Sequence, residues 1–427
     1  MVWITWAAMF ASVLGWVLRF GSRVPYWDDW RLVPVLAGGK PLTFAWLWTD
    51  ANAQRAPVAN LLQWALARAS GGDLRAGMLG SATMLGALAA VLIRCAARLR
   101  GRTSLSDACF PLVMLHLGHS YNLLTAIDLH FACHAAVFVV LLCCVLRGLD
   151  AGAGSLPLGL LACALLLPVQ SATGLVMAPV FGAWLLYAAG RSADSPRRWL
   201  LRATVLGMAA LSLAYMLGLR IATVGSSPAG LRSSLQTALQ FASTSLGPAG
   251  RTLWPLSGLA VAGLTAATAV LLLRTWRARP EQRVRAMGLL AALVAMGTLA
   301  LAVGVGRSGL GWEAGFGQRY VTSAGLLLCC IQLAWIVYGG PRWSRRVPAL
   351  LCLSMALLMP HNLRAGYDWA QALQDTKAPF ESDLSAGASP EELAERHGPQ
   401  LSPRQEGLAK KIELMRRTGL GIYKPSQ

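Results

Sequence analysis

The sequence contains little charge for its length. Only 13% of its 427 residues are Asp, Glu, Lys or Arg, whereas 55% are hydrophobic. A soluble domain has about 25% charged residues, so a chain of this length and composition cannot cover its own surface with polar groups. The totals predict an all-α polytopic membrane protein, in which lipid replaces water around the apolar helices.

Acidic residues are scarcer than basic ones, with 19 Asp and Glu against 38 Lys and Arg, and the formal net charge is +19. An excess of this kind is also typical of nucleic-acid-binding proteins. Here the arginines form short clusters between apolar runs rather than one basic face. We therefore expect membrane lipid and no nucleic acid as a partner, and we assign the arginines to cytoplasmic loops.

The sequence also lacks metal-binding cysteine pairs and internal repeats. None of its nine cysteines has CxxC spacing, and all lie in or beside apolar runs. They are typical of small hydrophobic side chains that face the core or the lipid. The absence of a repeat argues against a transporter built from two related halves.

Eleven apolar runs are candidate membrane spans, although several are shorter than the about 20 residues that the hydrocarbon core requires. They cover approximately residues 2–18, 76–93, 108–119, 130–146, 156–169, 174–190, 200–221, 252–273, 287–306, 320–338 and 347–360. No Lys or Arg precedes Val2–Leu18 and no A-x-A site follows it, so we interpret it as a retained helix rather than a signal peptide.

The distribution of arginine predicts how the chain is oriented. With a cytoplasmic N-terminus, the arginine clusters fall in the five short connections that follow the even-numbered spans. The positive-inside rule then places the N-terminus in the cytoplasm and the C-terminal tail outside. We expect two parts, a transmembrane domain over 1–360 that includes an outer loop at 19–75, and an extracytoplasmic helical tail over 361–427.

Several helices are predicted outside the membrane. Pro57 is suited to the first turn of a helix over Val58–Ala69. Ser389 is a suitable cap for a tail helix, and a second tail helix is expected over Gln405–Arg417, ended by Gly419.

Two adjacent carboxylates follow the first span, in the segment Tyr26–Arg31. Because neighbouring residues do not share a helix face, one carboxylate can face a cavity while the other binds arginine or backbone. This pattern indicates a catalytic base or a metal-linked carboxylate at the membrane surface, and the alternative is a helix cap with an interfacial ion pair. The catalytic candidates are Asp28 and Asp29, and the flanking Trp27 and Trp30 are candidates for substrate binding.

A predicted outer loop contains two arginines, Arg307 after a glycine-rich turn and Arg319 before Tyr320. Guanidinium groups bind phosphate through paired hydrogen bonds, and the glycine spacing does not match a dinucleotide-binding motif. We predict substrate phosphate binding at Arg319, with Arg307 and Tyr320 nearby. The alternative is a structural ion pair with Asp28, Asp29 or Glu313.

Three further segments carry polar candidates. Asp128, His130 and His134 are possible ligands of a divalent metal ion, although such histidines are more often hydrogen-bonded inside a bundle. Gln170 begins a polar hairpin and is a candidate for substrate binding. This hairpin and the segment 248–251 either line a cavity or cap helices.

Together, several motifs resemble those of bacterial polytopic membrane proteins related to the GT-C glycosyltransferases. The motifs are Tyr-Trp-Asp-Asp-Trp at 26–30, Pro-Leu-Thr at 41–43, Trp-Leu-Trp at 46–48, Ser-Ala-Thr-Gly at 171–174, Gly-Arg at 306–307, Gln-Arg-Tyr at 318–320 and Gly-Leu-Gly-Ile-Tyr at 419–423. The resemblance covers most of the chain. It implies a GT-C-like fold in the inner membrane and a polyprenyl-phosphate-linked sugar as donor. It places Asp28 or Asp29 in the role of base or metal partner, and Arg319 with Arg307 on the donor phosphate.

The chain departs from this group at one element. Relatives have a His-Asn-Glu-His-Arg-like stretch where this sequence has Ala-Asn-Ala-Gln-Arg at 51–55. Only Asn52 and Arg55 match, and Arg55 is kept as a candidate for substrate binding. We expect an inverting transferase that acts on an envelope glycan, lipid or protein. The departure allows a non-catalytic assembly protein as an alternative, and a lipid or polysaccharide transporter is the third class.

Overall fold

The computed structural model describes the chain except for residues 50–53, 149–157, 220–228, 403–406 and 424–427. Every regular element in the described residues is helical, which confirms the all-α prediction. The long helices are α1 (Val2–Phe20), α5 (Arg75–Arg100), α8 (Leu129–Arg147), α10 (Ala172–Arg191), α11 (Ser195–Met216), α14 (Leu256–Ala278), α15 (Arg283–Arg307), α16 (Val321–Tyr338) and α17 (Gly340–Ser385).

Shorter elements connect these helices. The α-helical ones are α2 (Val33–Leu36), α3 (Phe44–Leu47), α4 (Pro57–Ala69), α6 (Cys109–Met114), α7 (Ser120–Leu123), α9 (Leu158–Gln170), α12 (Leu231–Ser243), α13 (Ala249–Thr252), α18 (Pro390–Leu401) and α19 (Leu408–Thr418). The 3-10 turns are η1 (Trp27–Arg31), η2 (Leu105–Ala108), η3 (Leu117–His119), η4 (Ala126–Asp128), η5 (Thr244–Leu246), η6 (Pro280–Gln282), η7 (Ser308–Leu310), η8 (Ala314–Phe316), η9 (Gln318–Tyr320) and η10 (Gly421–Tyr423).

Nine segments of the described chain are long and apolar enough to cross a membrane, one around each long helix. They correspond to nine of the eleven predicted spans, so the protein is a multi-pass membrane protein. The expected span at 156–169 coincides with α9, which is apolar but shorter. The expected span at 108–119 is divided between α6 and η3, where His116 Nδ1 accepts a hydrogen bond from the backbone N–H of Gly118 at 3.1 Å.

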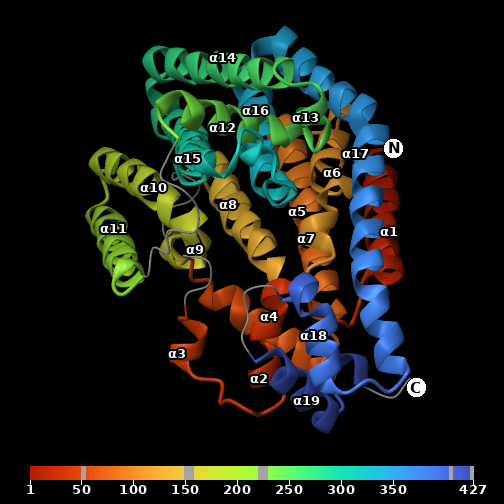
Figure 1. The fold of residues 1–427 in the computed structure, drawn as a ribbon. Helices are drawn as coiled ribbons and strands as arrows, with labels where there is room; N and C mark the ends of the chain where they lie inside the picture. Colours follow the sequence, from red (N-terminus) through yellow and green to blue (C-terminus); the bar gives the residue numbers. More distant parts are fainter. Residues whose placement is uncertain (50–53, 149–157, 220–228, 403–406, 424–427) are drawn as a thin grey trace.

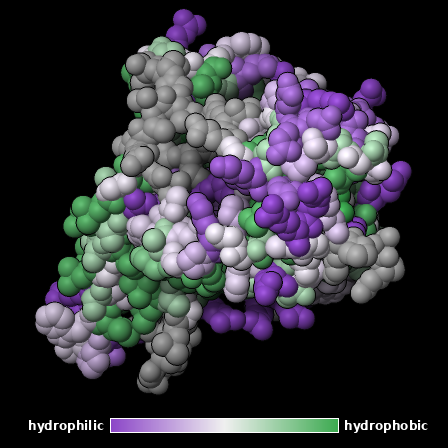
Figure 2. All heavy atoms as spheres, turned by 60° about the horizontal axis from the view of Figure 1, so that its bottom comes forward, coloured by the Kyte–Doolittle hydropathy of each residue, from purple (hydrophilic) through white to green (hydrophobic). Residues whose placement is uncertain are grey.

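Helices α8 and α16 form the centre of the bundle, because most of their residues are buried, whereas α1 and α11 bury few of theirs. A helix that is apolar on all sides is expected in the interior of a bundle or in contact with lipid. Figure 2 shows hydrophobic surface on the side that carries α10 and α11 in Figure 1. This surface is suited to lipid contact.

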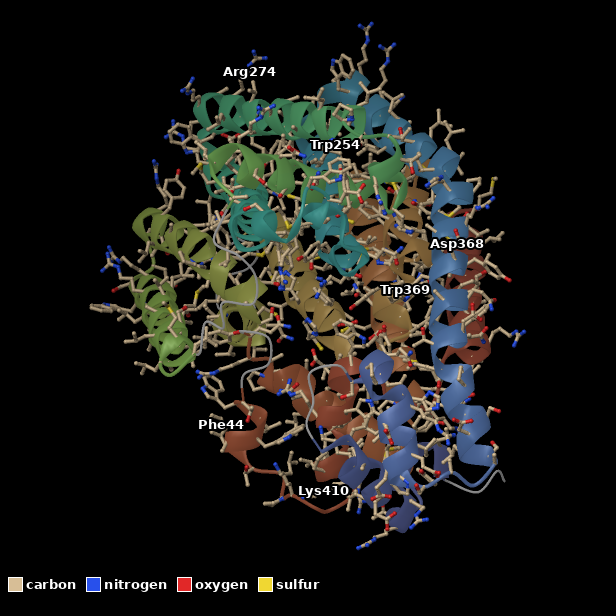
Figure 3. All side chains as sticks on the ribbon, in the orientation of Figure 1. Phe44, Trp254, Arg274, Asp368, Trp369 and Lys410 are labelled. Atoms are coloured by element: carbon tan, nitrogen blue, oxygen red, sulfur yellow. The ribbon has the colours of Figure 1, made fainter. Side chains whose placement is uncertain are left out.

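The arginine-rich helix ends lie together at one end of the bundle. Cys95 near the end of α5 interacts electrostatically with Arg98, Arg147 and Arg285, which belong to α5, α8 and α15. The Trp276 indole on α14 donates to the Tyr187 hydroxyl on α10 at 2.9 Å. In Figure 3, Arg274 of α14 and Lys410 of α19 lie at opposite ends of the molecule.

The C-terminal helices pack on the segment that follows α1. Trp30 and Val33 share a buried apolar cluster with Phe380, Leu393 and Ile412. Figure 1 shows α18 and α19 beside α2 and α4 at the end of the molecule where α17 finishes. The tail and the first loop therefore form one layer over this end, and hydrophilic residues gather there in Figure 2.

The three helices predicted beyond the spans are present, and the predicted start of the last one, Gln405, lies outside the described residues. The first, α4, begins at Pro57. In the tail, the Ser389 hydroxyl accepts from the backbone N–H of Glu392 at 3.3 Å and caps α18. Helix α19 ends at Gly419, whose φ of 60° is left-handed. One difference concerns α17, which continues through the expected boundary at residue 360, so the last span and the first part of the tail are a single helix.

Candidate functional site

Asp29 is completely buried and holds two segments together. Its Oδ2 accepts from the backbone N–H of Tyr26 at 3.2 Å, and its Oδ1 accepts from the backbone N–H of Ile127 at 2.8 Å. These bonds join η1 to η4, at the start of α8. Since both carboxylate oxygens are engaged by backbone donors, Asp29 has a positioning role.

A buried lysine on α17 faces the same carboxylate. Lys377 Nζ lies 5.4 Å from the centre of the Tyr26 ring, and its charge interacts with Asp29. Burial raises the pKa of Asp29 to about 6, and the charge of Asp28 adds to this rise. Lys377 and the two backbone N–H donors oppose it, so the carboxylate is mainly ionised at neutral pH. Sequence reasoning missed Lys377 because it lies in a helix with no recognisable motif.

Asp28 lies beside Asp29 but is only half-buried. It interacts electrostatically with Asp128, Tyr121 and Arg319, which come from η4, α7 and η9. The structure thus brings together three residues predicted from separate segments, Asp28, Asp128 and Arg319. We call these three residues and Tyr121 the carboxylate cluster.

Tyr121 was not predicted from the sequence, and its position depends on α17. Its ring lies 4.9 Å, centre to centre, from that of Trp369. Trp369 lies on the side of α17 that faces α7 (Figure 3). No sequence signal links two aromatic residues so far apart in the chain.

Arg319 is held by aromatic rings and backbone. Its Cζ lies 5.9 Å from the ring centre of Tyr121 and 5.8 Å from that of Tyr320. Its backbone carbonyl accepts from the Asn122 amide at 2.9 Å. Glu313, one of the carboxylates considered as a structural partner of Arg319, is paired with Arg251 instead.

Arg319 also lines a pocket of about 230 Å³ with two further arginines, Arg251 and Arg307. We call it the arginine pocket. Glu313 is the one carboxylate on the pocket wall, and it pairs with Arg251 through two contacts of 3.1 and 2.5 Å. Three guanidinium groups against one carboxylate leave the pocket positively charged. This chemistry suits a phosphate group, which binds best to paired, charge-assisted donors.

The flanking aromatic residues have different environments. Trp30 is buried among the tail helices, so it supports the fold. Trp27 is exposed and is the described non-glycine residue with a positive φ, at 51°. Such a backbone conformation is costly for a bulky side chain and is found most often at functional sites. It lies next to Asp28. Tyr320 is buried and its ring packs on Phe241 at 5.5 Å.

Arg55 is engaged by the protein itself. One of its guanidinium nitrogens donates to the carbonyls of Tyr215 and Leu217 at 2.7 and 2.9 Å. Its backbone N–H donates to the Tyr215 hydroxyl at 2.7 Å. These bonds attach the first loop to the end of α11, and the structure does not bring Arg55 to the arginine pocket. Residues 51–53, where the chain departs from the GT-C-related pattern, lie outside the described residues.

The polar candidates on α8 and α9 do not assemble into a metal site. In the described part of the chain, no three His, Cys, Asp or Glu side chains lie close enough to hold a metal ion. His130 is instead hydrogen-bonded inside the bundle, with Nδ1 3.0 Å from the carbonyl of Ile127. Gln170 is buried near Cys133 of α8.

Comparisons of the chain with protein-family models, with curated proteins and with solved structures find no match.

Proposed function

We propose that this protein is a GT-C-like glycosyltransferase that moves a sugar from a polyprenyl-phosphate donor to a hydroxyl group of an envelope glycan, lipid or protein. One observation carries the proposal: Arg319 lines the arginine pocket and also belongs to the carboxylate cluster. A phosphate bound by Arg319 and Arg307 would therefore lie beside a candidate base. An inverting transferase requires this juxtaposition of leaving group and base.

Asp28 is the proposed base, because it is partly accessible and within electrostatic range of Arg319, whereas Asp29 is fully buried. Asp28 takes the proton of the acceptor hydroxyl as the oxygen attacks the anomeric carbon. The bond from that carbon to the phosphate oxygen breaks, and polyprenyl phosphate leaves. Attack opposite the leaving group inverts the configuration at this carbon.

The arginines act on the leaving group. Negative charge on the phosphate increases as its bond to the sugar breaks, so a preorganised cation stabilises the transition state more than the bound donor. Arg319 is preorganised by the rings of Tyr121 and Tyr320. Arg251 is held by Glu313 and adds less charge to the pocket than the other two arginines.

We also propose that the membrane is the plasma membrane and that the N-terminus lies in the cytoplasm. This topology places the arginine-rich ends inside. It places the carboxylate cluster and the tail outside, where a lipid-linked donor enters from the outer leaflet. The clustering of Arg98, Arg147 and Arg285 at one end of the bundle supports the alternation of the spans.

The test is to delete the gene and compare envelope glycans and lipid-linked sugars before and after complementation with the wild-type gene. If the protein is a transferase, deletion should remove one glycan modification and cause its polyprenyl-linked sugar to accumulate. Complementation with the wild-type gene should reverse both effects. If deletion changes no glycan, the catalytic proposal is wrong. A glycan that is lost without accumulation of its donor points to the assembly role instead.

A further inference from the structure

Buried polar groups without hydrogen-bond partners gather around the first half of α8. His134 is 1% exposed, and in the described structure neither of its ring nitrogens has a partner. Gln170, also 1% exposed, has an unpartnered Nε2, and the adjacent Ser171 has an unpartnered hydroxyl. Asp128 Oδ2 is also buried without a hydrogen-bond partner. Buried polar groups are nearly always hydrogen-bonded in native proteins, so each of these requires an explanation.

These groups are connected through α8. His130 and His134 lie one turn apart and share a face of the helix, and they interact electrostatically. Cys133, next to His134, lies near the Gln170 side chain. The set therefore spans the contact between α8 and the end of α9.

The same set of polar groups is connected to the arginine pocket. Arg319, on the wall of that pocket, interacts electrostatically with both Asp128 and His130. From Arg319, the chain of interactions continues through His130 to His134 in the interior. Arg319 thus connects the wall of the pocket to this set of unsatisfied polar groups.

The Gln170–Ser171 turn is held firmly in position. A Cβ at Gly174, in the first turn of α10, would lie 2.0 Å from the carbonyl oxygen of Leu167 on α9. Only glycine permits this close approach. The backbone of the Gln170–Ser171 turn is therefore fixed by the packing of α9 against α10.

From these observations we propose that His134 and Gln170 form a subsite for the hydroxyl groups of the donor sugar; this inference rests on the proposed function. A neutral imidazole offers one donor and one acceptor, and an amide offers both. Sugar hydroxyls have the same dual capacity. An ionised ligand group is disfavoured, because neither side chain supplies a compensating charge and burial of an unpaired charge is costly. Arg319 would hold the phosphate while this subsite selects the sugar.

The experiment measures thermal unfolding of the purified full-length protein in detergent with two lipid probes. The first is the polyprenyl-phosphate-linked sugar fraction extracted from the deletion strain. The second is polyprenyl phosphate that carries no sugar. Both probes should stabilise the wild-type protein, and the sugar-bearing one should raise the melting temperature further.

The variants are His134→Leu and, as an independent second variant, Gln170→Leu. Each removes an unsatisfied polar group, so the free protein should melt at or above the wild-type temperature. The increment due to phosphate should persist, and the additional increment due to the sugar should be lost. His119→Leu is the matched control, because His119 is equally buried but both its ring nitrogens have partners, Thr322 and Val113, at 2.9 Å. It should lower the melting temperature of the free protein.

The inference is overturned if the sugar-dependent increment is absent in the wild type or unchanged in both variants. It is also overturned if both variants lower the melting temperature of the free protein as His119→Leu does, because the groups would then have structural partners such as buried water. Failure of the proposed function looks different: neither lipid would stabilise the wild type, or Arg319→Ala would bind both lipids as the wild type does.

Discussion

The Asp29 carboxylate accepts a hydrogen bond from the backbone N–H of Ile127, 2.8 Å away and 98 residues further along the chain. This bond fixes the segment after α1 to the start of α8, and so determines where the neighbouring Asp28 lies relative to Asp128. The buried Lys377 connects α17 to the same point. The geometry of the carboxylate cluster therefore depends on a residue that we assign no part in the chemistry.

The first prediction concerns this anchor. Asp29→Ala leaves the backbone N–H groups of Tyr26 and Ile127 without an acceptor, and each buried donor left unpaired costs roughly 1–3 kcal/mol. The variant should unfold at a clearly lower temperature in detergent. Asp29→Asn retains one acceptor, so its unfolding temperature should lie between those of Asp29→Ala and the wild type. Equal melting temperatures for Asp29→Ala and the wild type would show that the anchor contributes nothing.

The second prediction concerns pH. Burial raises the pKa of Asp29 from 3.8 to about 6, so the folded protein binds this proton more tightly than the unfolded chain does. Protonated Asp29 therefore stabilises the folded protein. This contribution to the free energy of unfolding is fully present below about pH 4 and is lost as the pH rises through about 6. The shift corresponds to about 3 kcal/mol at most. The melting temperature of the wild type minus that of Asp29→Asn should therefore decrease from pH 4 to pH 7. A constant difference would contradict the assignment.

The third prediction concerns the arginine pocket. Arg319→Ala should weaken binding of polyprenyl phosphate and reduce transfer by a factor on the order of 10²–10³, as expected for the loss of one charge-stabilising donor. Arg364→Ala is the matched control, because its side chain is 84% exposed and lies 4.0 Å from its nearest carboxylate partner, Asp368. Binding is measured with radiolabelled polyprenyl phosphate in detergent. Equal affinities for the two variants would remove Arg319 from the site.

The fourth prediction is a substitution that should strengthen the binding of polyprenyl phosphate. Glu313→Gln removes the one carboxylate of the pocket wall and releases Arg251 from its ion pair. The pocket gains positive charge and a third guanidinium group able to bind phosphate, so polyprenyl phosphate should bind more tightly, by a larger factor at low ionic strength. The same binding assay at two salt concentrations checks this. Weaker binding in Glu313→Gln would mean that Glu313 orients the site or contacts the ligand.

Much of the architecture was predictable, because apolar runs determine membrane-spanning helices locally. The positions of α1, α5, α8 and α16 agree with the predicted spans for this reason. Helix α17 was predicted to end near residue 360 because the apolar run ends there. It continues because Pro348, Pro360 and Pro379 are accommodated inside the helix, and because its polar half packs against the first loop and the tail.

The site was predictable only in part. Asp28 and Arg319 were identified because carboxylates and arginines are conspicuous next to apolar runs. Their proximity was raised only through the resemblance or as an alternative ion pair, since it depends on contacts between distant segments such as that of Asp29 with Ile127. Tyr121 and Lys377 have no local signal at all. Arg55 shows the converse, because a conspicuous arginine proves to be engaged by the carbonyls of Tyr215 and Leu217.

The most direct test of the central claim is the lipid-linked sugar pool in a deletion strain complemented with Asp28→Asn at wild-type membrane abundance. The proposed mechanism predicts that this variant folds and binds polyprenyl phosphate, yet fails to restore the missing glycan, so that its donor lipid accumulates as in the uncomplemented strain. Full restoration of the glycan by Asp28→Asn would contradict the assignment of this carboxylate as the catalytic base.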